Sequence, residues 1–451
     1  MVGSEEPWNF TQVGPGTPAK VWRRHADWGQ GEALSLEGIS RLVVVAAHPD
    51  DETLGAGGLI ASAVRLGLTV DIVCVTDGEH SHPYSPTHTP EELGRIRAEE
   101  ARNAAEVLGA DRVLRLELED GAVDSAQEYL TTQLVEAVGD GRRTVIVAPW
   151  RRDGHPDHEA VGHAAAAAAR RTGADLWEYP VWFWHWASPD EAPWPSLHPF
   201  VLDEQVLGVK LRAIRAHASQ VARLSALEGD ETLLTEEMLA HFEDGPEHYL
   251  RTPSAECPDD SLDRLHEEEA DPWGAESRWY EQRKRDLVLA MLPRPDFDRA
   301  LEIGCSTGAL AEALASRSKH VLAVDRSSAA LAAARRRFAD REHVAVAGFD
   351  VPHDWPADAT FDLIVVSEVG YFLSPAELDT LISRIVGSLD PAGVVVLCHW
   401  RHRVEGWVLD ADDVHTRFED SRLPALSATY RDRDVEIRVH AHDDGWPDPL
   451  R

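Results

Sequence analysis

Residues 41–52 read Arg-Leu-Val-Val-Val-Ala-Ala-His-Pro-Asp-Asp-Glu, an apolar run that ends in a cluster of histidine and acidic side chains. A short run rich in β-branched residues is typical of a strand buried on both faces of a parallel sheet. Ligands of open α/β sheets collect at the carboxyl ends of strands, where these polar residues stand. The stretch therefore predicts an α/β domain with a functional site directly after its first strand.

The alternation of short apolar runs and longer helical patterns occurs twice along the 451 residues. The first series predicts strands at 41–47, 70–76, 112–116 and 144–148 and helices at 54–66, 91–108, 127–138 and 158–171. The second predicts strands at 300–303, 321–325, 361–367 and 394–399 and helices at 277–292, 309–316, 328–338 and 376–389. We therefore expect two Rossmann-like α/β domains. The second should have a seven-stranded sheet ending in an antiparallel hairpin of residues 426–430 and 435–440.

These series place the first domain at residues 41–250 and the second at residues 273–451. Residues 251–272 lose periodicity and gather prolines and acidic side chains, a composition typical of a linker. Residues 1–40 are rich in Gly, Pro and Trp, and we expect them to form an arm packed on the first domain.

The amino-acid composition limits the classes of molecule that the protein is expected to bind. The formal net charge of −35 argues against binding to nucleic acid, because phosphate contacts need clustered Lys and Arg. No apolar run approaches the roughly 20 residues that span a bilayer, and the N-terminus lacks a signal-peptide pattern. We expect a cytoplasmic protein that acts on a small molecule and does not insert into membranes. The sequence leaves open whether it forms a homo-oligomer.

A second His-Pro-Asp cluster follows a second predicted strand. The strand at 144–148 runs towards His155-Pro156-Asp157-His158, so two strands deliver such clusters to one sheet edge. A single His-Pro-Asp tripeptide is usually a turn, but two copies placed in this way favour a metal site. Imidazole and carboxylate ligands suit zinc, and three protein ligands with an open position are typical of catalytic zinc. The spacing predicts His48, Asp51 and His158 as the ligands.

Two further side chains of these clusters remain available for catalysis. Asp50 is predicted to take a proton from the attacking water, and His155 to stabilise the oxyanion or protonate the leaving amine.

The two clusters, together with His217-Ala-Ser-Gln220, resemble the PIG-L/LmbE family of zinc amidases over roughly residues 41–250. The resemblance implies deacetylation of an N-acetylglucosaminyl conjugate, with zinc on the three residues named above. It also implies that Arg97 and Glu100 lie on a helix facing the substrate. An exposed charged helix face is the competing interpretation of these two residues.

Four tryptophans, at positions 177, 182, 184 and 186, alternate at nearly the period of a strand. We expect them to line a packed sheet face, and a wall that stacks against a sugar is the alternative interpretation.

The second domain carries a glycine-rich loop directly after its first strand. The segment 302–308 reads Glu-Ile-Gly-Cys-Ser-Thr-Gly, and small residues at Gly304, Ser306 and Gly308 allow a ligand to approach the backbone at a helix N-terminus. About twenty residues later, Asp325 ends the next strand, where an acid can accept hydrogen bonds from ribose hydroxyls. Asp350 follows the third strand region and is predicted to meet an adenine amino group.

Three other interpretations of this loop compete. Gly304-x-Ser306-x-Gly308 matches a nucleophile elbow formally, but the flanking acids have no role in one. Ser306 interrupts the pattern of a dinucleotide site, and a glycine turn without a ligand does not explain the paired acids. The loop is best interpreted as a site for S-adenosylmethionine.

Residues 361–373, together with 280–285 and 391–393, resemble class I methyltransferases, and the NodS-like enzymes in particular, over roughly 273–441. The resemblance implies N-methylation of a deacetylated amino sugar. It places Glu302 and Ser367 with the cofactor-binding residues named above, and Glu368 and Tyr371 near the substrate.

The two halves together predict a bifunctional enzyme that removes the acyl group from an amino sugar conjugate and then methylates the freed amine. Two alternatives stay open. The methyl group goes to a hydroxyl of the same or another glycoside, or one half is an inactive binding module.

Overall fold

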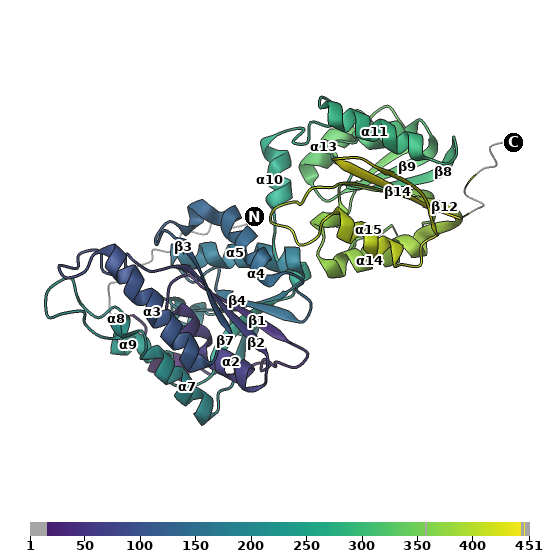
Figure 1. The fold of residues 1–451 in the computed structure, drawn as a ribbon. Coiled ribbons are helices and arrows are strands. Elements are labelled where there is room, and N and C mark those ends of the chain that lie inside the picture. Colours follow the sequence, from purple (N-terminus) through teal and green to yellow (C-terminus); the bar gives the residue numbers. More distant parts are fainter. Residues whose placement is uncertain (1–15, 357–358, 443–445, 447–451) are drawn as a thin grey trace. The chain divides into compact units, whose positions relative to one another are not determined.

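The computed structural model describes residues 16–356, 359–442 and 446, which form two compact units that divide between Pro258 and Asp259 (Figure 1). Each unit contains a seven-stranded, mostly parallel sheet, which confirms the α/β class and the hairpin predicted for the second domain. Within the described residues, no helix is long and apolar enough to cross a membrane.

The first unit orders its strands β3-β2-β1-β4-β5-β7-β6. The strands are β1 Arg41–Ala46, β2 Thr69–Thr76, β3 Arg112–Leu118, β4 Thr144–Pro149, β5 Asp175–Tyr179, β6 Leu197–Phe200 and β7 Glu247–Thr252. β1 to β5 run parallel, and β7 pairs antiparallel with both β5 and β6. β1 is the topological switch point, because the chain moves outwards from it in both directions. The carboxyl ends of β1 and β4 are therefore neighbours.

Helices cover both faces of this sheet, with α4 and α5 on one side and α2, α3 and α7 on the other (Figure 1). Their bounds are α2 Asp51–Arg65, α3 Pro90–Leu108, α4 Gln127–Val138, α5 Pro156–Thr172 and α7 Glu204–Ile214. The helices start where the sequence provides caps. Thr89 and Glu92 form a capping box ahead of α3, and Gly109 ends that helix in the left-handed conformation.

The second unit orders its strands β10-β9-β8-β11-β12-β14-β13. They are β8 Phe297–Ile303, β9 Ser318–Asp325, β10 Val344–Gly348, β11 Phe361–Ser367, β12 Leu389–Trp400, β13 Leu426–Arg431 and β14 Val435–Ala441. Its helices are α10 Ser261–Glu268, α11 Trp279–Met291, α12 Ala309–Ala315, α13 Ser328–Arg337, α14 Pro375–Ser388 and α15 Ala411–Glu419. Alternate residues of β11 face different cores: Leu363 and Val365 belong to one cluster, Ile364 and Val366 to the other.

Two expectations differ from the structure. Residues 251–272, predicted to be a linker without periodicity, include the end of β7 at Thr252 and the helix α10. The tryptophans after position 177 do not lie on a strand. Trp182 lies in the turn before the short helix α6 (Phe183–Trp186), and Trp184 and Trp186 lie within this helix. Asp153 is the reason, because its carboxylate accepts the backbone N–H groups of residues 181–183 and so imposes a helical start.

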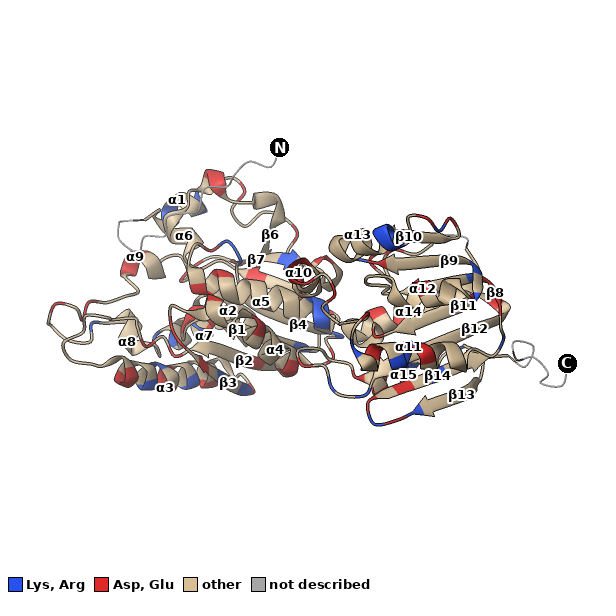
Figure 2. Ribbon diagram, turned by 90° about the horizontal axis from the view of Figure 1, so that it is seen from above, with Lys and Arg blue, Asp and Glu red and all other residues tan. Residues whose placement is uncertain are grey.

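The N-terminal arm is described only from residue 16, and residues 1–15 lie outside the described part. Within it, Trp22 of α1 (Ala19–Arg23) is fully buried in the core of the first unit and donates to the carbonyl of Trp184. Acidic residues occur along the helices and loops of both units (Figure 2).

Candidate functional site

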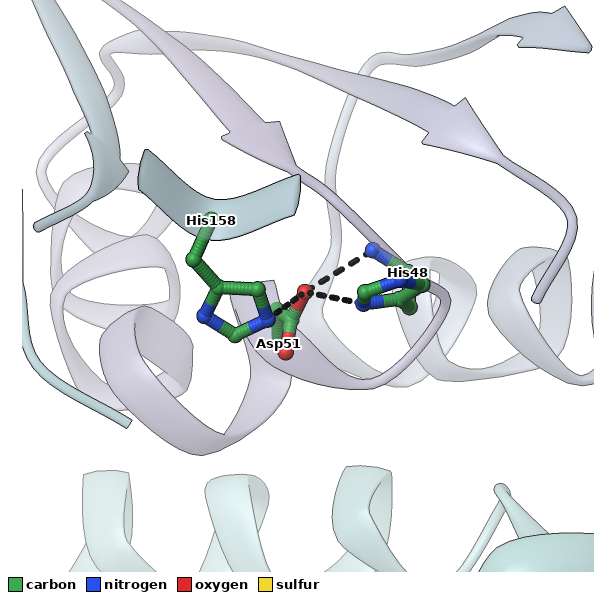
Figure 3. A group of neighbouring side chains, drawn as sticks. All are labelled: His48, Asp51 and His158. Carbon is green, nitrogen blue, oxygen red and sulfur yellow. Dashed lines mark hydrogen bonds and ion pairs between the residues drawn. The ribbon is translucent and has the colours of Figure 1, made fainter. Parts of the chain in front are cut away.

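Two histidines and one aspartate converge where β1 and β4 end. His48 follows β1, Asp51 is the first residue of α2, and His158 lies in the first turn of α5. Asp51 Oδ2 lies 3.5 Å from His48 Nδ1 and 3.2 Å from His158 Nε2 (Figure 3). All three residues are buried, and one ligand atom from each lies within 4.8 Å of the others. The three predicted ligands are thus brought together as a metal site requires.

The donor set fits zinc. His158 Nε2 is buried and makes no hydrogen bond among the described residues, although it faces Asp51. Its other ring nitrogen, Nδ1, lies 2.7 Å from Asp153 Oδ2, which fixes the orientation of the ring. Histidine that binds a metal through one nitrogen and a carboxylate through the other is a recurring arrangement of zinc sites. Asp153 was not predicted from the sequence.

His48 has further acidic neighbours. Its Nε2 lies 3.1 Å from Asp120 Oδ1 and 3.2 Å from Asp157 Oδ2. Burial lowers the pKa of His48, but these carboxylates and Asp51 outweigh burial and raise it well above its ordinary value. His48, His155 and Asp157 form a second group with ligand spacing, and it shares His48 with the first.

Asp50 lies beside the triad in a backbone conformation that non-glycine residues rarely adopt, with φ of 120°. Strain of this kind at a strand-to-helix turn persists only where neighbouring contacts hold it. Arg97 supplies them: one terminal nitrogen lies 2.8 Å from the Pro49 carbonyl and 3.1 Å from Asp50 Oδ2, and the other donates to Gly78. Burial raises the pKa of Asp50 to about 7, although Arg97 opposes the rise. A carboxylate of this basicity suits general base catalysis near neutral pH.

His155 precedes α5, and its Nδ1 accepts the backbone N–H of Asp157 at 3.2 Å. Because burial and the neighbouring His158 and His48 lower its pKa to about 3, the ring is neutral at pH 7. A neutral ring that accepts at Nδ1 carries its proton on Nε2. His155 therefore presents an N–H donor, the form that stabilises a developing oxyanion.

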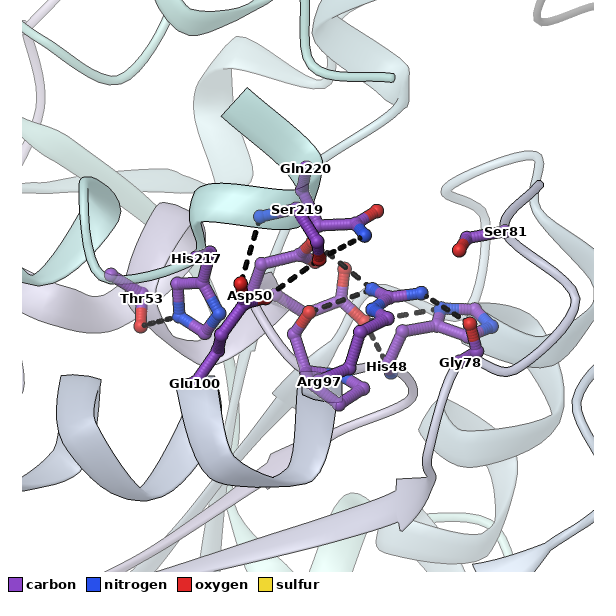
Figure 4. Close-up of polar contacts among 12 residues, drawn as sticks. His48, Asp50, Thr53, Gly78, Ser81, Arg97, Glu100, His217, Ser219 and Gln220 are labelled. Carbon is purple, nitrogen blue, oxygen red and sulfur yellow. Dashed lines mark hydrogen bonds and ion pairs between the residues drawn. The ribbon is translucent and has the colours of Figure 1, made fainter. Parts of the chain in front are cut away.

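Arg97 and Glu100 of α3 are not the exposed charged face considered above, because both are buried. Glu100 accepts from the backbone N–H and the hydroxyl of Ser219 at 2.8 and 2.7 Å (Figure 4). The Glu100 carboxylate is thus hydrogen-bonded to Ser219, and the Arg97 guanidinium is paired with Asp50. Glu100 therefore supports Ser219 and Arg97 supports Asp50, and contact of either residue with the substrate stays a prediction.

A second supporting chain runs from the 217–220 segment to α2. His217 Nε2 lies 3.1 Å from Thr53 Oγ1, which donates to Glu52 at 2.8 Å, and Glu52 accepts the backbone N–H of Asp50 at 3.3 Å. Burial raises the pKa of Glu52 to about 7. Sequence reasoning used the 217–220 segment only as a family feature. Asp120 was missed, although it follows β3 at the same edge of the sheet.

The second unit also gathers its predicted residues at strand ends. After β8, Gly304, Ser306 and Gly308 have φ of 74°, 48° and 84°. Asp325 at the end of β9 accepts the backbone N–H of Ser306 at 2.8 Å. The glycine-rich loop and Asp325 of the neighbouring strand are therefore hydrogen-bonded to each other.

The loop leaves several buried polar atoms without partners among the described residues, namely Glu302 Oε2, Ser306 Oγ and Thr307 Oγ1. Burial raises the pKa of Glu302 well above its ordinary value. Such atoms fit a polar ligand such as S-adenosylmethionine. Because Ser306 Oγ has no histidine partner, a nucleophile elbow is not supported.

The remaining predicted residues lie at or after the ends of β10 and β11. Ser367 ends β11, next to β8. Asp350, after β10, lies 3.9 Å from the Arg326 guanidinium. Glu368 directly follows β11 and contacts the hydroxyl of Tyr371, so these two predicted substrate residues are neighbours.

Comparison with known proteins agrees with the division into two parts. Residues 43–169 match the family model PIG-L, GlcNAc-PI de-N-acetylase, and residues 257–423 match NodS, nodulation protein S. A 1D-myo-inositol 2-acetamido-2-deoxy-α-D-glucopyranoside deacetylase of Mycobacterium sp. (strain KMS) is 27% identical over 283 residues, 52% of this chain and 90% of that protein. Nodulation protein S of Sinorhizobium fredii is 34% identical over 152 residues, 33% of this chain and 66% of that protein.

Among solved structures, the N-methyltransferase NodS of Bradyrhizobium japonicum WM9 in complex with S-adenosyl-L-homocysteine is 26% identical. The match covers 41% of this chain and 97% of that chain, with a TM-score of 0.38. The two family models and the two relatives above show that the protein is a bifunctional enzyme, a deacetylase joined to a methyltransferase. Its first part is an amino-sugar deacetylase domain of the PIG-L family, and its second part is a NodS methyltransferase domain, as the sequence predicts.

Proposed function

We propose that the protein removes the acetyl group from an N-acetylglucosamine conjugate in a zinc-dependent reaction and then transfers a methyl group from S-adenosylmethionine to the freed amine. The observation that carries the first half is the convergence of His48, Asp51 and His158 beside Asp50. Relatives named as deacetylases of an acetamido-glucopyranoside and of diacetylchitobiose support this substrate class.

In the first half, His48, Asp51 and His158 would hold zinc, which supplies Lewis-acid polarisation and lowers the pKa of water. Asp50 takes the proton of the attacking water, held in place by Arg97. His155 donates its Nε2–H to the oxygen of the amide carbonyl as negative charge develops there. Asp50 then returns the proton to the leaving amine.

In the second half, the loop 304–308 and Asp325 would bind S-adenosylmethionine, the methyl donor. The unpartnered Glu302 Oε2, Ser306 Oγ and Thr307 Oγ1 would satisfy polar groups of that molecule. Methyl transfer needs mainly the correct positioning of the acceptor atom against the methyl group.

The chemistry of nitrogen sets the order of the two steps. The lone pair of an amide nitrogen is delocalised into the carbonyl, so an acetamido sugar is a poor nucleophile. Hydrolysis releases an amine whose lone pair attacks a methylsulfonium. The first reaction therefore produces the acceptor of the second.

Mass spectrometry of N,N′-diacetylchitobiose incubated with zinc-loaded protein tests this sequence. Loss of acetyl without S-adenosylmethionine, followed by gain of one methyl group only when it is added, supports the proposal. Methylation of sugar that keeps both acetyl groups would indicate a hydroxyl acceptor. Absence of either reaction would indicate that the corresponding half is a binding module.

A further inference from the structure

A polar cluster in the methyltransferase unit lies between α11 and the ends of β11 and β12. We call it the acceptor cluster, and it consists of Tyr280, Glu281, Lys284, Glu368, Tyr371 and Trp400. The carboxyl ends of parallel strands are where ligands of such folds bind. Only Glu368 and Tyr371 of this set were predicted from the sequence.

Glu368 is held in place unusually firmly. Its φ of 60° is rare for a residue with a side chain, and such strain concentrates at functional sites. One carboxylate oxygen lies 3.0 Å from Lys284 Nζ. The other accepts the backbone N–H of Trp400 at 3.1 Å and contacts the Tyr371 hydroxyl. Its side chain nevertheless keeps 23% of its surface exposed, so a ligand has access to it.

The acceptor cluster lacks one positive charge. Lys284 Nζ lies 2.8 Å from Glu281 and 3.0 Å from Glu368, so one ammonium serves two carboxylates. Arg283, on the same helix, pairs with Asp432 instead. His399 also faces the cluster, but burial lowers its pKa to about 4, so it is neutral at pH 7. Lys284, Glu281 and Glu368 together carry a net charge of −1, which one additional cation would balance.

Aromatic groups complete a site for such a cation. The rings of Tyr280 and Trp400 lie 5.5 Å apart, and the Tyr280 ring already lies 5.2 Å from the Lys284 ammonium. The buried Tyr280 Oη makes no hydrogen bond among the described residues. Aromatic faces and a carboxylate are the groups that bind ammonium ions in proteins.

The acceptor cluster also adjoins the cofactor loop. Val369, the residue after Glu368, lies so close to Gly304 that a Cβ on Gly304 would be 2.1 Å from Val369 Cγ2. A ligand nitrogen bound at Glu368 is therefore near the loop that would hold the methyl donor.

We propose that Glu368, with Tyr280 and Tyr371, binds the amine of the acceptor as its ammonium and so selects the deacetylated sugar over the acetylated one. This inference rests on the proposed N-methylation. The ammonium gives one proton to the Glu368 carboxylate, and the freed lone pair forms a bond to the methyl carbon of S-adenosylmethionine. The carbon–sulfur bond breaks with its electron pair left on sulfur. The products are the methylated ammonium and S-adenosylhomocysteine, and Glu368 returns its proton to solvent.

The test uses the full-length protein with two acceptors, chitobiose carrying one free amine and N,N′-diacetylchitobiose. Glu368→Gln should raise the KM for the amine at least tenfold and change the KM for S-adenosylmethionine less than about twofold. Glu342→Gln, an exposed charge removal in the same unit, should change neither. Tyr280→Phe removes only the unpartnered hydroxyl and should raise the amine KM about threefold, even if the Glu368 variant folds poorly.

Three results would overturn the inference. Glu368→Gln with an unchanged amine KM means that the carboxylate does not bind the amine. A rise confined to the KM for S-adenosylmethionine means that the missing cation is the sulfonium of the donor. A methylated product that keeps both acetyl groups, made by the wild type from N,N′-diacetylchitobiose, removes the basis of the N-methylation itself, whereas the first two results leave that proposal intact.

Discussion

Asp153 Oδ2 lies 2.7 Å from Nδ1 of His158, and the same carboxylate accepts the backbone N–H groups that begin α6. One buried side chain thereby orients a predicted zinc ligand and shapes the loop on the far side of the site. Asp153→Asn should lower zinc affinity about 10- to 100-fold, because the ring loses its fixed orientation and basicity.

Competition with a chelator measures that affinity. Asp190→Asn, an exposed change in the same unit, is the matched control and should bind zinc as the wild type does. Methylation of a free amine should survive in both variants. Unchanged zinc affinity in Asp153→Asn would contradict the assignment of His158 as a ligand.

Arg97 is predicted to hold the catalytic base rather than the substrate. Its two terminal nitrogens reach Gly78, Pro49 and Asp50 at once, which the single nitrogen of a lysine ammonium does not reproduce. Both Arg97→Lys and Arg97→Ala should lower the kcat of deacetylation roughly 10- to 100-fold at unchanged zinc content. Steady-state kinetics that show only a higher KM in both variants would instead place Arg97 on the substrate.

Gly304 is predicted to be irreplaceable in the second site. Its φ of 74° disfavours a side chain, and an added Cβ would collide with Val369. Gly304→Ala should abolish binding of S-adenosylhomocysteine, measured by calorimetry, and leave deacetylation unchanged. Adding Val369→Ala removes the collision but not the backbone strain, so it should restore binding only in part. Normal binding by the single variant would refute this account of the loop.

Two buried histidines predict how the stability of the methyltransferase unit depends on pH. His399 Nδ1 lies 2.8 Å from His415 Nε2, and burial lowers their pKa values to about 4 and about 2. Because the unfolded chain binds protons near pH 6.5 and the folded one does not, stability is lost as pH falls below about 6.5. The titration of His399 alone lowers the free energy of unfolding by about 3 kcal/mol as the pH falls from 6.5 to 4.

Hydrogen exchange of the β12 peptides follows this loss in the intact chain. The stability advantage of the wild type over His399→Gln should shrink as the pH is lowered from 7 to 4.5. A difference that stays constant over this range would show that His399 does not titrate upon unfolding.

Local patterns predicted the metal triad because short strands and turns fix where His48 and Asp51 lie. The supporting residues were not predictable in the same way. Asp153 and Asp120 reach the site only through the folded sheet edge, and Glu100 depends on the distant Ser219. The tryptophan alternation failed as a strand signal because the carboxylate of Asp153 decides the local conformation.

The acceptor cluster, likewise, could be predicted only in part from the sequence. Glu368 stands at a strand end and was predicted from local sequence, whereas Lys284 and Tyr280 come from a helix about eighty residues earlier. Their relevance follows only from the charge count in the folded unit.

The order of the two reactions is tested by the Asp50→Asn variant, which lacks the base of the first site but keeps the second site intact. With S-adenosylmethionine present, we expect no methylation of N,N′-diacetylchitobiose and a wild-type rate with chitobiose that carries one free amine. Methylation of the diacetylated sugar by this variant would contradict the proposed order of the two reactions.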